Sequence, residues 1–533
     1  MVQQSHLLND RLSIDSLQKI KPDETLPTSY SELKSPNGVL LQNDDGSLRP
    51  PNGSVSAYSW ENLGMLTHIA AVGIVYGTVS GVIYSVLNNY LHMSATLVAT
   101  ATALVTFPRA LRLFTGLLTD CVPICGYRRR PYMILGWMLS FVSCLLMAAL
   151  PLGEPYYGDP SLSDIATSDL TPEQLALINT DAPNRGIKLI ILMMIANFGT
   201  VMAYSGFNGV LVDVSQREAE AKRGTALGDV VVIHYVFMIF SSFMSGIGLN
   251  SEDYGGTFSW TMGFNAIMWV CAAASLLTIP FSWYCIQEVK GERVSMSVTT
   301  YLYNLFQERA IYRYAAFRFF FLVFSQITVT ASSVIQSDWA KVEPLNSGIA
   351  IAVVCIDAIP TMLTIWDVYR SQWFWLGVPL VGELPYAAAD YVAQLFILEI
   401  ENIKGFEATL MGLAVTTESV GIPFATVITK TVDGYFDIER TFIEQDDHHV
   451  RSHVTYTYLI AYMFNLFSIA FVFLLPKQKA EVREMQNEGR KSKFWGIVTM
   501  SYLAFSLCWT LMTNILSLFD STSCLRIAGG TGC

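Results

Sequence analysis

Four residues of one apolar segment have the types and the spacing of a polar stripe: Arg109, Arg112, Gly116 and Asp120, separated by three, four and four positions. Residues at these intervals lie on one face of an α-helix. Arg112 lies about 12 Å along such a helix from Asp120, at about 1.5 Å per residue. A guanidinium at that depth in a membrane costs about 2.5–3.5 kcal/mol, so Arg112 should face the protein interior or a wet cavity. It suits binding of a carboxylate. A structural ion pair or a snorkel to the surface explains it equally well.

The stripe ends in a turn, from Gly116 to Pro131, that joins two apolar segments and contains Arg128, Arg129 and Arg130 in succession. A lipid-spanning helix does not accommodate three consecutive arginines, so this turn should lie at a membrane surface. Positively charged loops stay on the cytoplasmic side. The turn therefore sets the orientation of the segments on both sides of it.

The composition is that of a membrane protein: 52% of the 533 residues are hydrophobic and only 14% are charged. Stretches of about twenty apolar residues predict an all-α polytopic fold. No catalytic motif, nucleotide-binding loop, zinc spacing or dinucleotide fingerprint occurs at a credible place. We therefore expect no enzyme activity, no cofactor and no metal. The net charge of −11 gives no support to nucleic-acid binding.

Six spans are predicted in the first half of the chain, at 64–89, 95–118, 131–152, 187–211, 226–249 and 260–282. With a cytoplasmic amino end, the basic loops fall inside and the acidic loop 153–186 falls outside, as the charge rule requires. The predicted organisation is a disordered polar cytoplasmic tail over 1–57, a six-helix bundle over 58–285, a cytoplasmic linker over 286–312, a second helical bundle over 313–518 and a tail over 519–533.

Six further spans in the second half are predicted at 314–335, 348–366, 373–398, 408–430, 455–475 and 495–518, which makes about twelve in all. Counted literally, they leave the acidic loop 431–454 inside and the basic loop 476–494 outside, against the charge rule. One crossing more or one fewer between about 336 and 430 repairs both loops. Hydropathy alone leaves both possibilities open.

The run formed by Gly116, Asp120, Gly126, Arg128 to Arg130 and Pro131 resembles the loop between the second and third helices of the folate–biopterin transporter family, a branch of the major facilitator superfamily. Three further stretches agree: Arg112 to Asp120, DVSQREAEAKRG at 213–224, and ELP at 383–385 with GFEATLMGL at 405–413. The tail segments PKQKAEVREMQNEG and STSCLRIAGGTGC resemble oomycete-like members in particular. Compared with them, this chain is shortened near Asn346, by one helix.

The resemblance implies two bundles with a substrate site between them and alternating access. It also implies that Asp120 forms an ion-pair latch with Arg128, Arg129 and Arg130 at the cytoplasmic gate. In the simpler interpretation, the arginines only set the orientation of the chain in the membrane. Asp213 with Arg217 is expected to be a second gate pair.

The expected substrate site includes Arg112, at a position where the family often has a basic residue, and residues of the fourth span. There Tyr204 and Asn208 stand where many relatives have aspartates, and Glu383 follows in the second half. The remaining candidates for proton coupling are Asp229, His234, Asp357 and Asp390. A single histidine in a helix more often makes a structural hydrogen bond than carries a transported proton.

The sequence and the resemblance together predict a proton-coupled transporter of folate, a pterin or a related conjugated solute, in the plasma membrane or in an organelle membrane. Two alternatives stay open: a transporter of another anionic or zwitterionic solute, and a degenerate membrane protein that transports nothing. The expected partners are a small-molecule substrate and the lipid bilayer. The oligomeric state is not readable from the sequence.

Overall fold

The computed structural model describes residues 47–48, 56–93, 95–159, 161–162, 171–286, 288, 290, 298–329, 331–332, 335, 339, 358–371, 391–400, 406–438, 440–443, 445–476, 481–482, 484–485, 491–516, 520–523 and 525. Apart from isolated β-bridges, the regular structure of these residues is helical. Eight helices among them are long and apolar enough to cross a membrane. The prediction of an all-α, multi-pass membrane protein is confirmed.

The first half of the chain forms the long helices α1 (Leu63–Ile83), α2 (Ala95–Thr106), α3 (Arg112–Cys121), α4 (Arg130–Ala149), α6 (Ala182–Arg217), α7 (Thr225–Gly248) and α8 (Gly263–Tyr284), with a short α5 (Pro172–Leu175) in a loop. Helix α4 packs between α6 and α8, and α1 packs against α7 and α8. Gly73 and Gly77 of α1 face His234 and Ser241 of α7, so the small residues allow these two helices to approach closely.

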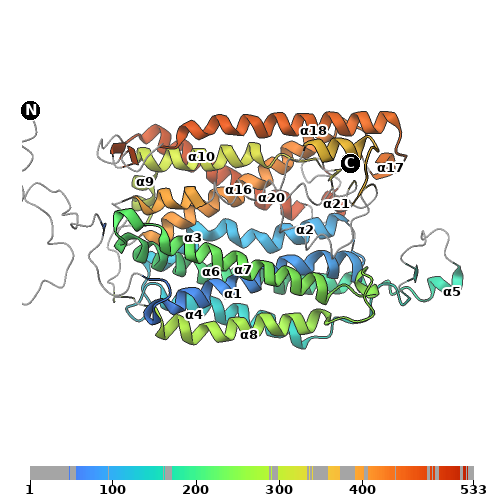
Figure 1. Cartoon of the computed structure of the whole chain (residues 1–533), viewed down its shortest axis with the longest axis horizontal. Coiled ribbons are helices and arrows are strands. Elements are labelled where there is room, and N and C mark those ends of the chain that lie inside the picture. The colour runs from blue at the N-terminus through green and yellow to red at the C-terminus, as the bar shows by residue number, and fades with distance from the viewer. Residues whose placement is uncertain are drawn as a thin grey trace, which may run out of the picture.

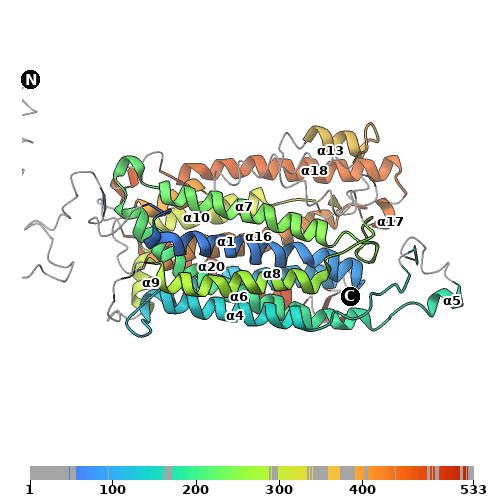
Figure 2. The ribbon, with the colours of Figure 1, turned by 60° about the horizontal axis from the view of Figure 1, so that its bottom comes forward.

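The second half forms α9 (Val298–Phe306), α10 (Arg309–Ser325), α13 (Ala358–Ile365), α16 (Glu407–Asp433), α17 (Arg440–Ile443), α18 (His448–Ser468), α20 (Lys493–Leu516) and α21 (Asp520–Ser523). Helix α10 packs against α16, α18 and α20. Helix α16 also packs against α3 and α6 and so joins the two halves. Figures 1 and 2 show the long helices side by side along one axis.

Large apolar side chains cover much of the outer surface of the bundle. Val232 and Phe240 on α7 are 62% and 50% exposed, and Met463 and Leu466 on α18 are 70% and 68% exposed. Apolar surface of this extent would be costly in water, whereas lipid covers it at no such cost. The two helices therefore present their outward faces to the bilayer.

One end of the bundle, here called the inner end, carries the Arg128 to Arg130 turn. Arg129 of this turn pairs with Glu407 at the start of α16, at 2.8 Å. Lys491, just before α20, pairs with Glu308 just before α10, at 3.8 Å. The starts of α10, α16 and α20 and the turn with the arginines therefore share one end, which Figure 1 shows at the left with α9.

The opposite end, here called the outer end, carries α5 and α17 (Figure 1). Helix α10 runs toward it, and the N–H of Thr328 beyond its end donates to Thr429 in the last turns of α16, at 3.2 Å. Trp366 and Arg370, which follow α13, contact His448 and Asp446 at the start of α18. Residues 326–329 and 366–371 thus lie at the same end of the molecule.

This arrangement bears on the crossings in the second half. The chain is at the outer end both after α10, at residues 326–329, and after α13, at residues 366–371, and residues 348–357 of the predicted span 348–366 lie outside the described residues. The described part of loop 431–454 then lies at the outer end, and Lys491 lies at the inner end. Both loops then obey the charge rule, with the sidedness opposite to that of the literal count.

Candidate functional site

A break in the second span places two arginines where the halves meet. The sequence predicts one helix over 95–118, but a 3-10 turn, Phe107–Leu111, separates α2 from α3. Pro108 in the first turn of this segment has no N–H to donate and interrupts the α-helical hydrogen bonds. Within the break, Arg109 approaches Glu418 on α16, and directly after it Arg112 approaches Tyr204 on α6.

Glu418 is the centre of an ion-pair cluster between the halves. Its carboxylate accepts hydrogen bonds from Arg318 of α10 at 2.8 Å and from Arg109 at 3.4 Å. Arg109 also donates to the hydroxyl of Tyr76 on α1, at 3.0 Å. Glu418 and Arg318 are both buried. Charges in such a place are tolerated because they are paired and hydrogen-bonded.

Arg112 has a different environment. It is only 5% exposed, and its guanidinium lies over the ring of Tyr204, 3.8 Å from the ring centroid. This is a cation–π contact. Its Nε and Nη2 atoms are buried and have no hydrogen-bond partner among the residues that the structure describes. Buried donors of a charged group are costly unless an acceptor reaches them, so Arg112 suits an anionic ligand.

The side chains of Tyr204, Phe207 and His68, here called the aromatic wall, lie beside Arg112. Tyr204 stacks on Phe207, and His68 of α1 stacks on Phe207 with ring centroids 4.6 Å apart. Trp137 donates to His68 Nδ1 at 3.0 Å, so the neutral imidazole carries its proton on Nε2. His68 Nε2 is buried and has no hydrogen-bond partner among the described residues. It is a donor available to an acceptor on a bound molecule.

Among the described residues, Arg109, Arg112 and Arg318 lie near the carboxylate of Glu418. In a medium of low dielectric constant such charges act more strongly than at a water-exposed surface. The arrangement can hold an anionic group of a ligand by its guanidinium donors and a flat ring against its aromatic side chains.

The structure places the other predicted binding residues differently. Tyr204 contacts Arg112, as the site hypothesis requires, and Asn208 is buried on α6 one turn further on. Asn197, on the same helix, donates to the Val105 carbonyl near the helix break at 2.9 Å, which is a structural role. Glu383 lies outside the described residues.

Two of the four proton-coupling candidates are described. His234 hydrogen-bonds to the backbone of Ile69 and lies within electrostatic reach of Arg109 and Arg112, whereas its Nδ1 atom is buried with no hydrogen-bond partner in the described part of the chain. Asp229 lies in the first turns of α7, toward the inner end and away from the cluster. Asp357 and Asp390 lie outside the described residues.

At the inner end, Asp120 joins α3 to the second half. Its carboxylate is buried and accepts hydrogen bonds from the N–H and the hydroxyl of Thr409, both at 2.8 Å. Thr409 lies in the first turn of α16, so the carboxylate also meets the positive end of that helix dipole. The expected latch between Asp120 and the arginines of its own turn stays a prediction: these hydrogen bonds of Asp120 go to the start of α16, and Arg129 lies within electrostatic reach of its carboxylate.

The three arginines of the turn act in other ways. The backbone N–H groups of Arg128, Arg129 and Arg130 all donate to the carboxylate of Glu288, at 2.8, 2.8 and 3.0 Å. The guanidinium of Arg129 pairs with Glu407 of α16. One turn therefore anchors the segment after α8 and, through Arg129, the start of α16.

The expected second gate pair, Asp213 with Arg217, is present but lies within α6. The bond between the halves is made close by, where Arg223 pairs with Glu399 at 2.7 Å. Both side chains are almost fully buried, at 0% and 5% exposure. Because both charges are buried, removal of either partner leaves the other without compensation, which is costly.

Gln216 adds a further link, because its amide donates to the carbonyls of Leu398 and Ile400 at 3.3 and 3.2 Å. Glu218 stays within the first half and caps α7 by accepting from the N–H groups of residues 224–226. Burial raises the pKa of the Glu218 carboxyl despite these hydrogen bonds. The inner ends of α6 and α7 are thus tightly fixed.

Sequence reasoning missed the most connected residue of the site, Glu418, and its partner Arg318. Both stand inside predicted apolar spans, 408–430 and 314–335. The signal was the same one that singled out Arg112, since an ionisable residue within a span requires a partner or a cavity.

A family model and several solved structures are similar to parts of this chain. Residues 73–158 match the model of the BT1 family, that of the folate–biopterin transporters. Similar solved structures include a D-xylose–proton symporter (13% identity, 78% of this chain and 97% of that chain, TM-score 0.47). A transporter of the POT family in complex with a thioalcohol-conjugated peptide is 10% identical (77% and 95%, TM-score 0.44). A bacterial homologue of the human lysosomal transporter Spinster is 11% identical (82% and 100%, TM-score 0.42).

No curated protein matches the sequence. The matched segment 73–158 contains the helix break, Arg109, Arg112 and the turn with the three arginines. Together with the membrane-spanning helices, the match favours a role in membrane transport. The chain is therefore a multi-pass membrane protein whose residues 73–158 match the model of the BT1 family.

Proposed function

We propose that this protein transports folate, a pterin or a related conjugated anion across the plasma membrane, by alternating access and driven by a proton gradient. The substrate would lie between the halves, beside Arg112 and the aromatic wall. The observation that carries the proposal is the buried guanidinium of Arg112, with two donor atoms that no described residue uses, stacked on Tyr204. A carboxylate accounts for the free donors, and a flat heterocycle accounts for the aromatic neighbours.

Alternating access needs contacts that hold one end closed and can break. Asp120 with Thr409, Arg129 with Glu407, and Arg223 with Glu399 link the halves at the inner end. In the proposed cycle these links close the path from the site to the inner side, and separation of the halves opens it.

Proton coupling in this scheme uses His234, the described candidate beside the cluster. Substrate arrival changes the charge near Arg109 and Arg112, which in turn changes the affinity of the His234 imidazole for a proton. Replacement by glutamine, His234→Gln, should leave substrate exchange at equal pH intact and abolish uphill uptake driven by a pH gradient.

Uptake of labelled folate into cells or proteoliposomes tests the substrate. Arg112→Ala should reduce saturable uptake at least tenfold, and Arg112→Lys should restore it only in part, because a lysine lacks the planar set of donors. For uptake by the intact protein, a pterin without a carboxylate should be a weaker competitor of labelled folate than unlabelled folate is. For Arg112→Ala, the two should compete equally poorly. Surface labelling of each variant controls for its amount in the membrane.

A second candidate function is transport of another organic anion, because the two Arg112 donors that no described residue uses would serve any carboxylate. Uptake of a simple dicarboxylate that depends on Arg112, with no competition by folate, would support that function instead. Absence of any uptake by the intact chain would favour a membrane protein that does not transport.

A further inference from the structure

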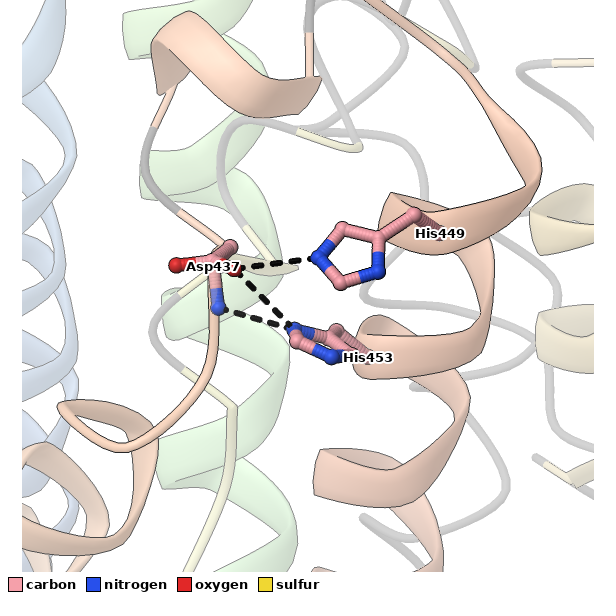
Figure 3. A group of neighbouring side chains, drawn as sticks. All are labelled: Asp437, His449 and His453. Atoms are coloured by element: carbon pink, nitrogen blue, oxygen red, sulfur yellow. Dashed lines mark hydrogen bonds and ion pairs between the residues drawn. The ribbon is translucent and has the colours of Figure 1, made fainter.

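Three metal-binding side chains meet at the outer end of the second half: Asp437, His449 and His453 (Figure 3). The two histidines stand one turn apart on α18, with ring centroids 4.0 Å apart. Asp437 follows α16 in the turn before α17. One ligand atom from each residue lies within 4.8 Å of the other two. The sequence predicts no metal, because no zinc spacing occurs at a credible place.

The hydrogen bonds point the ligand atoms toward one another. The carboxylate of Asp437 lies 3.1 Å from His449 Nε2 and 3.7 Å from His453 Nδ1. The backbone N–H of Asp437 donates to His453 Nδ1 at 3.1 Å, so this nitrogen is unprotonated, and a bound ion would take the place of this hydrogen bond. An unprotonated imidazole nitrogen is what a metal ligand requires.

We propose that Asp437, His449 and His453 bind a divalent transition-metal ion of the zinc type on the outer surface. Two imidazole nitrogens and one carboxylate oxygen are a donor set that suits Zn²⁺, with water at the fourth position. Ca²⁺ and Mg²⁺ prefer sites made of oxygen ligands, so they should not compete. Asp437 and His449 are exposed to solvent, which gives the ion direct access.

The surrounding residues hold the ligands in place. Asp447 caps α18 by accepting from the N–H of Val450 at 2.8 Å, which fixes the first turn of the helix that carries both histidines. Asp446 binds Arg370 at 2.6 Å and Arg451 at 2.9 Å. Burial alone would raise the pKa of Asp446, but these hydrogen bonds hold it below its usual range, so the ion pairs persist at neutral pH.

The charge of this loop favours a cation as well. Residues 431–454 contain six acidic residues and two arginines. A negative local potential raises the concentration of cations at the surface. A bound ion would connect the end of α16 to the start of α18, and it would stabilise the loop between them without a contact to Arg112 or to the inner end.

Isothermal titration with ZnCl₂ tests the proposal on the full-length protein in detergent, purified through a tag without histidine and treated with EDTA. The intact chain should bind one ion per molecule, and CaCl₂ should give no binding heat. His449→Ala and His453→Ala should each weaken zinc affinity by about tenfold or more. His448→Ala is the matched control, because His448 lies on the same turn but contacts Trp366.

Thermal unfolding gives an independent readout of the same site. Zinc should raise the unfolding midpoint of the intact chain and of His448→Ala, and it should not raise that of the double variant His449→Ala/His453→Ala. Equal midpoints of all three proteins without zinc would show that the substitutions leave the fold intact. Absence of stoichiometric binding by the intact chain, or undiminished binding by the double variant, would overturn the proposal.

Discussion

At the scale of single residues, the main feature is one carboxylate shared by two arginines inside a membrane protein. Glu418 compensates Arg318 and Arg109, whereas Arg112 beside them relies on the ring of Tyr204. Removing one partner of a buried ion pair leaves the other charge without compensation, at a cost of about 3–5 kcal/mol. Removing both charges together costs much less.

This argument predicts a non-additive pair of substitutions. Glu418→Gln and Arg318→Gln should each lower the midpoint of thermal unfolding by several degrees, and the double variant should recover most of the loss. Tryptophan fluorescence of the purified protein during heating measures the midpoints. If the double variant lost as much as the two single variants together, the pair would not be coupled.

At the scale of helices, the crossing of α3 and α16 decides how closely the halves approach. Gly116 of α3 faces the carbonyl of Ala408, and Gly412 of α16 faces the carbonyl of Arg112. A side chain at either place would meet backbone, which cannot move aside as a flexible side chain can. The contact therefore depends on two residues without a Cβ atom.

Gly412→Val should push the inner halves of α3 and α16 apart. We expect a cysteine introduced for the buried Thr409 to react faster with a thiol reagent applied from the inner side when Gly412→Val is also present. The matched control is Gly246→Val, because a Cβ atom at Gly246 of α7 would have no neighbour within 4 Å.

Gly412→Ala, with a smaller side chain, should give an intermediate rate. The same reactivity of the Thr409→Cys protein with and without Gly412→Val would show that the crossing does not keep this end closed.

At the scale of the whole molecule, the number of crossings follows from contacts between loops. The described residues at the inner end include Arg129 and Lys491, and those at the outer end include Trp366 and Asp446. The chain therefore crosses the membrane an odd number of times between the Arg128 to Arg130 turn and α21, with α21 at the outer end in Figure 1.

Impermeant thiol labelling of intact cells tests this topology. In a background with serine at Cys125, Cys508, Cys524 and Cys533, we expect Tyr435→Cys to react from outside, since Tyr435 is 84% exposed in the turn after α16. Lys491→Cys should react only after permeabilisation. Labelling of Lys491→Cys from outside, with Tyr435→Cys reacting only after permeabilisation, would restore the even number of crossings of the literal hydropathy count.

The sequence predicted several features because their physical basis is local. The cost of leaving a peptide group or a charge in lipid is set by a stretch of about twenty residues, so the membrane class and most spans are readable. The same argument identified Arg112 and the orientation of the arginine turn. The break at Pro108 was also accessible in principle, because proline interrupts a helix wherever it stands inside one.

The sequence by itself determined the all-helical membrane class, the sidedness of the charged loops and the residues of the second span that could bind a ligand or pair with a charge. Only the tertiary structure decided that Glu418 pairs with Arg109 across some three hundred positions, that Asp120 meets Thr409, and that Trp366 lies at the same end as His448. The reason is physical: burial costs are properties of a segment, whereas the partner of a charge depends on which helices pack together.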